Sequence, residues 1–424
     1  MNKTVLTLFI ITAVLVLLSI IPSVAQSPKK ETTFTVVQRD GRYFLAAPND
    51  SIIFPVGLNH LNIHELQQQI DTLQTLGEDE LNAVLYRYLT DWGFTSSGYD
   101  RVHTLNNNHN ILHYVKTEIL SLASYHGEPV YRDIFDSSTY AFFEQKIQPL
   151  AVYNDDPNVI GLMYSDLPRY RPTETLNWVR FYRQLPSTAP GRLRYHEFLT
   201  QKYQHDLATF NRVYRENIST ISKLSSLTFE NTDANNLTML KDDAEFVSII
   251  YRQYLQSLYE LHQKYAPNLM FLSDVFGRPR EWTDELIRIA GEYCDVISFQ
   301  PSDNVLDTAL CQRIYKLSGK PIIIADQKVS FAEAGYDNIQ GDEVATEALA
   351  ATGYTDYLIA CFDSPIVVGY NRCMFKSKFR PGGVLKQGLL DFNGDPYSVI
   401  VESVVTTNRE IIDAVRQLNQ SIAR

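Results

Sequence analysis

The sequence predicts an α/β fold, a (β/α)8 TIM barrel preceded by a short N-terminal β-hairpin, and three observations support this prediction. Eight short apolar runs alternate with amphipathic stretches at helical spacing, which is typical of parallel βαβ units. Polar residues follow each apolar run, as they do at the carboxyl ends of barrel strands. An Asp40-Gly41 turn between two strand-like runs precedes the first unit, and this pair is a strong hairpin signal.

The expected elements follow one another in a regular order. The hairpin covers 34–38 and 43–46, and a turn at 48–50 leads to the first barrel strand. The eight strands are expected to end at Asn59-His60, Gly98-Tyr99, Thr117-Glu118, Asp166, Asp274, Gln300-Pro301, Asp326-Gln327 and Asn371-Arg372. The clearest helices are expected at 140–151, 244–265, 281–290, 344–359 and 397–418.

The region 171–241 is too long for one βα connection. We expect it to be an insertion between the fourth and fifth strands, with helices at 175–182 and 195–214. The expected organisation is therefore a linker and hairpin over 26–51 and a barrel over 52–424 that carries this insertion.

The N-terminus has the layout of a secretory signal peptide. Lys3 supplies the positive charge, 5–21 is apolar, and Ser23-Val24-Ala25 offers a small-residue cleavage site. Cleavage after about Ala25 would export the mature chain to the periplasm, the cell surface or the medium. The apolar run is longer than most signal cores, so an uncleaved membrane anchor remains the alternative.

Composition narrows the class of partner. The chain has 424 residues, of which 45% are hydrophobic and 21% charged, so it should fold as a globular protein. A net charge of −11 argues against nucleic acid and against an anionic membrane as partners. The sequence leaves the oligomeric state open.

The four cysteines lie in the last third of the chain, and none forms a CxxC pair. A zinc site is therefore not expected, and small buried thiols are favoured over a disulfide. No metal and no organic cofactor is implied.

Two carboxylates at expected strand ends could carry chemistry. Asp166 follows the fourth strand and Asp326 the seventh, so they should face each other across the barrel mouth. Such a pair suits glycoside hydrolysis, in which one acid protonates the leaving oxygen and the other attacks or activates water. The alternatives are ordinary ones: each aspartate could instead cap a turn, and Asp274 with Arg278 could form a structural salt bridge.

Further polar and aromatic residues at these ends are expected to bind substrate. They are Asn59, His60, Tyr99, Tyr164, Asp274, Arg278, Trp282, Gln300, Tyr370 and Arg372. The aromatic members would serve as platforms for sugar rings, and Arg278 and Arg372 would suit an acidic or sulfated sugar.

Several segments together resemble the agarase-like glycoside hydrolases, (β/α)8 enzymes of a large retaining clan. The resemblance spans roughly 34–418 and rests on FPVGLNHLN, DWGFTSSGYD, the run from DIFDSS to GLMYSD, GEYCDVISFQPSD, GKPIIIADQ and PIVVGYNRCMF. It implies a barrel fold and a carbohydrate substrate.

The catalytic positions depart from the pattern of that clan, which ends strand four in Asn-Glu and strand seven in a nucleophilic Glu. This chain has Ser165-Asp166 and Asp326 there, and each shortening removes one carbon–carbon bond, widening the gap by about 2 Å in total. Retaining pairs lie ~5–5.5 Å apart and inverting pairs ~6.5–9.5 Å, so the change favours inverting geometry or loss of hydrolysis. The acids could instead be displaced to Asp274 or Glu281.

The sequence thus indicates an exported glycoside hydrolase-like protein that acts on a polysaccharide or oligosaccharide through two carboxylates. One alternative is an inactive barrel that binds glycan. Another is a lyase or other carbohydrate enzyme that uses His60 or a tyrosine as base.

Overall fold

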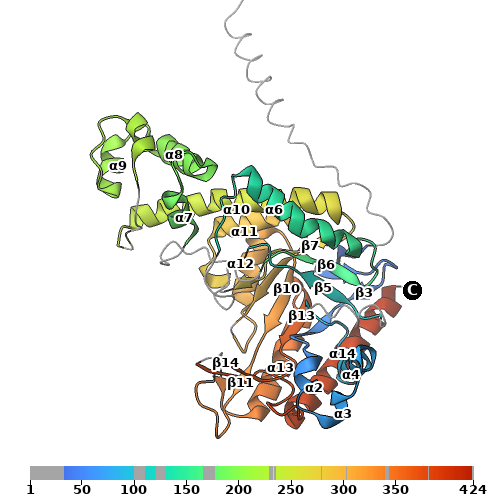
Figure 1. Ribbon diagram of the computed structural model, residues 1–424. Helices are drawn as coiled ribbons and strands as arrows, with labels where there is room; N and C mark the ends of the chain where they lie inside the picture. The colour runs from blue at the N-terminus through green and yellow to red at the C-terminus, as the bar shows by residue number, and fades with distance from the viewer. Residues whose placement is uncertain are drawn as a thin grey trace, which may run out of the picture.

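The computed structural model consists mainly of parallel strands covered by helices (Figure 1). It describes residues 33–99, 110–120, 130–165, 177–228, 233, 235–277, 279–301, 303–339, 343–380 and 382–422.

Two parallel sheets form the centre of the molecule. The larger has the order β4-β13-β10-β9-β8 and the smaller the order β5-β6-β7. Their bounds are β4 Val56–Asn59, β5 His113–Lys116, β6 Val159–Met163, β7 Met270–Phe271, β8 Phe276–Gly277, β9 Ile297–Gln300, β10 Ile322–Gln327 and β13 Val367–Cys373. β6, β10 and β13 are buried along their whole length. Their near-continuous apolar runs are therefore those of parallel strands covered on both faces.

Isolated parallel bridges connect the two sheets at both edges. Ser96 bridges Gly57 in β4 and also Leu112 beside β5, while Leu272 after β7 bridges Val296 before β9. The strand ends expected at Asn59, Gln300 and Gln327 are confirmed. The last strand runs one residue further than expected and ends at Cys373.

Helices cover the sheets on opposite sides. α10, α11 and α12 lie along one side, and α4, α13 and α14 lie on another (Figure 1). The bounds are α2 Ile63–Gln67, α3 Asp71–Gln74, α4 Glu78–Asp91, α6 Ser137–Ile147, α10 Leu237–Tyr265, α11 Asp284–Tyr293, α12 Thr308–Ser318, α13 Glu347–Asp363 and α14 Ser398–Ile422. The expected helices over 140–151, 244–265, 281–290, 344–359 and 397–418 are confirmed with shifted ends.

Capping side chains explain where several helices begin. Asp136, Asn236, Thr283, Asp307 and Thr346 each accept a hydrogen bond from a backbone N–H in the first turn of the helix that follows. Such caps satisfy donors that have no partner within the helix.

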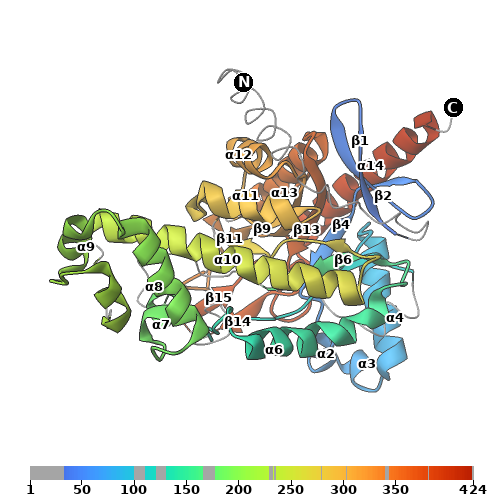
Figure 2. The same cartoon turned by 90° about the horizontal axis from the view of Figure 1, so that it is seen from above.

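The region 177–226 forms a helical lobe beside one end of α10 (Figures 1 and 2). It contains α7 Trp178–Gln184, α8 Pro190–Tyr203, α9 Leu207–Tyr214 and the 3-10 turn η3 Ile221–Ser226. A single helix over 195–214 is wrong, because the Asp206 side chain accepts from Thr209 N at 3.0 Å and begins a new helix there.

The N-terminal hairpin is confirmed. β1 Thr35–Arg39 pairs antiparallel with β2 Arg42–Ala46, which pairs with β3 Ile52–Ile53. Asp40 and Gly41 have φ of 50° and 79°, the positive values that such a tight turn requires. The hairpin lies beside α14 (Figure 2), where the Asn419 side chain hydrogen-bonds both backbone groups of Ile52.

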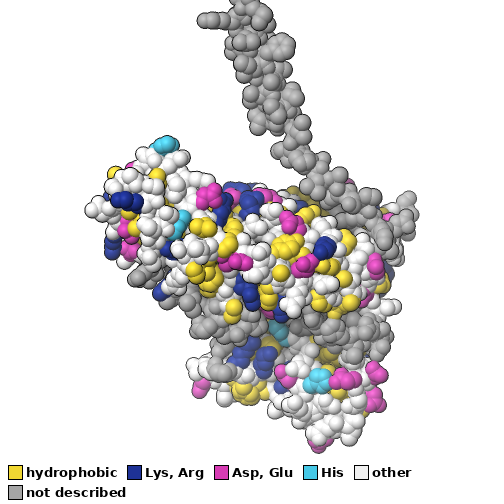
Figure 3. Space-filling view, turned by 45° about the horizontal axis from the view of Figure 1, so that its top comes forward, with side chains coloured by type: hydrophobic (Ala, Val, Ile, Leu, Met, Phe, Trp, Pro, Cys, Tyr) yellow, Lys and Arg dark blue, Asp and Glu magenta, His cyan; other side chains and the backbone are white. Residues whose placement is uncertain are grey.

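Two small sheets extend the loops after β10 and β13. β11 Ser330–Phe331 pairs with β12 Glu343–Val344, and β14 Lys378–Arg380 pairs with β15 Gly383–Leu385. On the face shown in Figure 3, side chains of both charges are interspersed over the helices. In the ranges given above, no helix is both long and apolar enough to cross a membrane. All four cysteines are buried free thiols, as expected.

Candidate active site

The carboxylate of Asp326 lies where the ends of several strands meet. Asp326 is only 3% exposed and stands near the end of β10. Its Oδ1 accepts a hydrogen bond from Asn59 Nδ2 at 2.7 Å, and its Oδ2 accepts one from Gln300 Nε2 at 3.1 Å. Parallel pairing in the order β4-β13-β10-β9 brings these residues together, because the carboxyl ends of parallel strands share one edge.

Asn59 is held rigidly for this contact. Its Nδ2 also donates to Ala325 O at 2.8 Å, and its Oδ1 accepts from Tyr99 N at 3.2 Å. The chain passes close by at Gly98, where a Cβ would lie 2.0 Å from Asn59 Oδ1 and where φ is +63°. Only glycine fits that position without displacing Asn59.

His60 is the partly exposed member of the group. Its side chain is 32% exposed, and its Nε2 lies 3.7 Å from Asp326 Oδ2. Burial works against the imidazolium, but the acidic groups around it, Cys373 and Asp326, outweigh burial and raise the pKa of His60 well above its ordinary value. The backbone of His60 has φ +58°, a conformation uncommon outside glycine.

The pKa of Asp326 is shifted in the opposite direction. Burial would raise it, but the His60 imidazole and the Asn59 amide outweigh burial and lower the pKa of Asp326 below its ordinary value. The two shifts together favour an ionised carboxylate beside a protonated imidazole. A carboxylate in that state can attack a carbon or accept a proton.

Cys373 completes this corner of the site, and the sequence analysis did not select it. The His60 ring nitrogen, an Asp326 oxygen and Cys373 Sγ lie within 4.8 Å of one another. Burial raises the pKa of the Cys373 thiol. Nitrogen, oxygen and sulfur donors at these distances could hold a divalent cation. The sequence analysis did not expect a zinc site, because the chain has no CxxC pair. Alternation along β13 was the available signal, because Cys373 shares the face of Asn371.

Asn371 also belongs to this inward face. Its Nδ2 and Oδ1 are buried and form no hydrogen bond with any residue that the structure describes. A Cβ at Gly57 would lie 2.0 Å from Asn371 Oδ1, so the two strands approach closely here. An amide in this position has both a donor and an acceptor to offer to a ligand.

A second polar group surrounds the end of β6. Ser165 Oγ lies 2.9 Å from Tyr254 OH, which donates to Asp274 Oδ1 at 3.4 Å. Asp274 is thus buried against α10. Asp166 and Arg278, both selected from the sequence, lie outside the described residues.

Four residues expected to contact sugar face away from the strand ends. They are Tyr164, Trp282, Tyr370 and Arg372, all at most 5% exposed. The Tyr164 hydroxyl hydrogen-bonds His262 Nδ1 at 2.7 Å, and Trp282 stacks on Phe276 with ring centroids 3.5 Å apart.

The other two pack against the helix side of β13. Tyr370 OH donates to Gln327 Oε1 at 2.7 Å, and the Arg372 guanidinium lies 5.3 Å from the centre of the Tyr354 ring. Side chains alternate between the two faces of a strand, so Tyr370 and Arg372 point outward when Asn371 and Cys373 point inward. Tyr99 is also buried, with its ring centre 6.0 Å from that of His60.

Comparison with solved structures finds glycoside hydrolases. The chain matches an exo-β-agarase with a TM-score of 0.75 and 16% identity over 90% of this chain and 65% of the agarase. It matches another agarase, AgWH50C, with a TM-score of 0.73 and 15% identity over 91% of this chain and 65% of that one. A GH2 β-galacturonidase from Eisenbergiella tayi matches with a TM-score of 0.51 and 11% identity over 89% and 54% of the two chains.

The chain therefore spans about two thirds of the length of these agarases. No protein-family model matches the sequence, and no curated protein sequence matches it. At these identities the likeness concerns the fold alone: the chain has a glycoside hydrolase-like fold.

Proposed function

We propose that this chain is a carbohydrate-active protein, a glycoside hydrolase in which Asp326 is one of two catalytic carboxylates. The observation that carries the proposal is the Asp326 carboxylate itself, buried at the strand ends and held by Asn59, Gln300 and His60. Buried carboxylates are costly unless a site is built around them, and such sites are commonly functional.

The proposed scaffold is a (β/α)8 barrel. The bridges at Ser96 and between Leu272 and Val296 link the two parallel sheets at both edges, which supports closure into one ring of strands. In such barrels the active site lies at the carboxyl ends of the strands. The region 171–241 is proposed as an insertion in this barrel, and 1–25 as a signal peptide that exports it.

The proposed reaction uses Asp166 as the second carboxylate, delivered by the segment that follows β6. Asp166 would protonate the glycosidic oxygen as the bond to the anomeric carbon breaks. Asp326 would attack that carbon or take a proton from the attacking water. The protonated His60 beside Asp326 keeps the carboxylate ionised, which suits this role.

A glycan-binding protein without hydrolysis is the second candidate. It is favoured by Ser165-Asp166 where the resembling enzymes have Asn-Glu, and by the burial of Tyr164, Trp282 and Tyr370 away from the strand ends. Such a protein would hold sugar through Asn371 and His60 and would not need Asp326 to be ionised.

The test is an assay of the mature protein on agarose, other neutral polysaccharides and uronic acid polymers, measuring new reducing ends. We expect Asp326→Asn to lower turnover at least about 1,000-fold while glycan affinity changes little, because the lost group acts on the transition state. Asp166→Asn should also lower turnover while leaving glycan affinity little changed. Asp303→Asn, which removes a charge from a surface ion pair with Arg280, is the matched control and should keep full activity.

The outcome separates the two candidates. Turnover that survives in Asp326→Asn would exclude the proposed mechanism. Binding by the wild type without any cleavage would favour the second candidate. For an active enzyme, NMR of the first product anomer would distinguish inversion from retention.

A further inference from the structure

A cavity lies in the helical lobe. Its volume is about 850 Å3, and it is lined by residues of α7, the start of α8, the end of η3 and the segment after η3. Three arginines line it, Arg180, Arg183 and Arg192, together with hydroxyls that include Ser225, Ser226 and Thr228. Among the described lining residues none is acidic, although the chain as a whole carries a net charge of −11.

The three arginines line one cavity because of where the helices place them. Arg180 and Arg183 are three residues apart on α7 and so share one face of that helix. Arg192 comes from the first turn of α8, and its guanidinium donates to Leu227 O at 2.6 Å, which fixes it beside the segment after η3.

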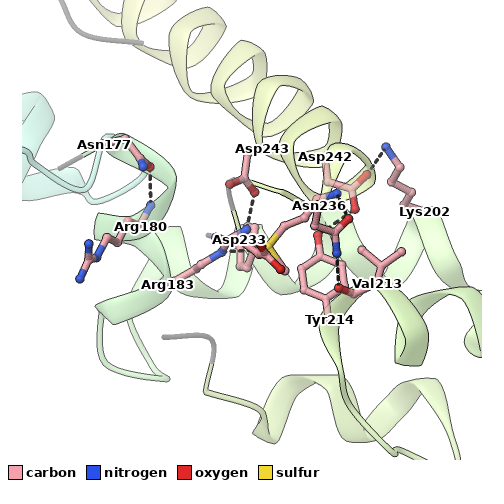
Figure 4. Close-up of polar contacts among 12 residues, drawn as sticks. Asn177, Arg180, Arg183, Lys202, Val213, Tyr214, Asp233, Asn236, Asp242 and Asp243 are labelled. Carbon is pink, nitrogen blue, oxygen red and sulfur yellow. Dashed lines mark hydrogen bonds and ion pairs between the residues drawn. The ribbon is translucent and has the colours of Figure 1, made fainter. Parts of the chain in front are cut away.

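Arg183 is anchored from behind by a buried polar network (Figure 4). Its guanidinium pairs with Asp243 on α10, and its Nε donates to Tyr195 OH at 2.8 Å. The neighbouring Asp242 accepts from Tyr203 OH at 2.6 Å and from Tyr214 OH at 2.8 Å, and it pairs with Lys202 at 2.8 Å. These contacts hold α7, α8 and α9 against α10 and keep the cavity wall in place.

Of the two buried guanidinium groups at this cavity, Arg183 is compensated by Asp243, whereas Arg192 carries an electrostatic cost. Arg183 is 1% exposed and Arg192 is 3% exposed. Burial and the charge of Arg183 together lower the pKa of Arg192, although Tyr195 opposes this shift. An anion bound in the cavity would offset the cost of burying the charged Arg192, because it would add an opposite charge in a region of low dielectric.

We propose that this cavity binds an oxyanion, the sulfate ester or the carboxylate of an acidic glycan chain. Planar guanidinium groups bind both kinds of anion through paired hydrogen bonds. That a glycan carries the anion rests on the proposed function, whereas anion binding itself rests on this cavity alone.

The experiment is isothermal titration calorimetry on the full mature chain at low ionic strength. The probes are a sulfated galactan oligosaccharide, an oligogalacturonate and a neutral agaro-oligosaccharide of equal length, with inorganic sulfate as competitor. We expect a charged probe to bind at least about tenfold more tightly than the neutral one and to be displaced by sulfate. The tighter of the two charged probes identifies the anion.

Variants assign this binding to the cavity. Arg192→Gln should weaken binding of the charged probe about tenfold or more. Arg180 is only half-buried, so Arg180→Gln is the milder change and should weaken binding several-fold. Arg194→Gln is the matched control, because Arg194 is on the same helix but pairs with Glu197 outside this cavity. The affinity of the Arg194→Gln protein for the charged probe should stay within about twofold of the wild-type affinity.

Two results would overturn the proposal. One is equal affinity for neutral and charged probes, and the other is unchanged affinity in a folded Arg180→Gln protein. Asp326→Asn keeps the cavity intact, so it should bind the charged probe as the wild type does. Loss of turnover and loss of anion binding are thereby separate readouts of the two proposals.

Discussion

At the scale of single residues, Asp326 shows how a buried charge is made tolerable. Two amide donors, from Asn59 and Gln300, and the His60 imidazole face its oxygens. Hydrogen bonds to the ionised form offset the cost of removing a carboxylate from water. The result is a carboxylate that is ionised and positioned before any ligand arrives.

The His60–Asp326 pair predicts a definite pH behaviour. The raised pKa of His60 means that its contribution to stability is complete below about pH 6.5 and is lost as pH rises through the folded pKa. The lowered pKa of Asp326 means that its contribution is present above about pH 4 and is lost as pH falls through the folded pKa. The pair should therefore stay charged across the neutral range.

We expect the His60 imidazole to be protonated at pH 7 in the folded protein and Asp326→Asn to lower its pKa, because the substitution removes the negative charge beside the ring. Two-dimensional proton–nitrogen NMR of the histidine rings would measure this titration. The ring signals of the exposed His64, which lies on α2 and pairs with Glu78, serve as the internal reference. A His60 titration that is identical in both proteins would contradict the pairing.

At the scale of elements, the helical lobe is fastened to α10 by charge as well as by apolar packing. Arg183 on α7 and Asp243 on α10 form a pair in which both side chains are 0% exposed. Removing one partner of such a pair leaves an uncompensated buried charge, whereas replacing both with apolar residues often costs little.

Asp243→Leu should therefore lower the free energy of unfolding by about 3–5 kcal/mol. The double variant Arg183→Met/Asp243→Leu should recover most of that loss. Urea unfolding, monitored by circular dichroism, measures the free energy of unfolding of the single and the double variant. Asp413→Asn, in an exposed i,i+3 pair with Arg416, is the control and should cost less than about 1 kcal/mol. A double variant no more stable than the single one would show that the pair itself is stabilising.

The elements also show what periodicity can predict. The long helices α10 and α14 carry clear amphipathic patterns, so they were foreseen. The start of α10 lies earlier than expected because the Asn236 side chain caps the helix there. The pattern over 195–214 continued through Gln204 and Asp206 without a visible break. A local cap, and not the apolar spacing, divides α8 from α9 there.

At the scale of the whole molecule, the N-terminal hairpin and the C-terminal helix meet. Tyr43 N donates to Pro365 O at 2.8 Å, just before β13, and Asn419 of α14 holds Ile52 of β3. The hairpin is thus anchored by contacts among residues 42–419.

We therefore expect export to remove the N-terminal segment without loss of stability. Mass spectrometry of the protein secreted by an expressing host should give a chain that begins at Gln26, because the small residues before it form the cleavage site. The purified chain should melt at the same temperature as one produced without residues 1–25. A full-length chain found in the membrane fraction would instead indicate an uncleaved anchor.

The sequence by itself determined the order of many elements, the hairpin at Asp40-Gly41 and the strand ends at Asn59, Gln300 and Gln327. Each depends on local patterns: apolar runs, turn residues and helical periodicity. Asn59, His60, Gln300 and Asp326 could be selected as one site because parallel strands present their carboxyl ends together.

Only the tertiary structure decided which side chains face that site. Tyr370 and Arg372 were expected at the strand ends together with Asn371. Side chains alternate along β13, however, so Asn371 points inward to the site while Tyr370 and Arg372 point outward. Cys373 lies at the site although it was not expected there, and Tyr164 and Trp282 lie away from it although they were expected there. Packing against distant helices decides these positions. The cavity of the helical lobe likewise depends on how α7, α8 and η3 meet. No local pattern specifies this, because contacts between separate segments leave no periodic signal in the sequence.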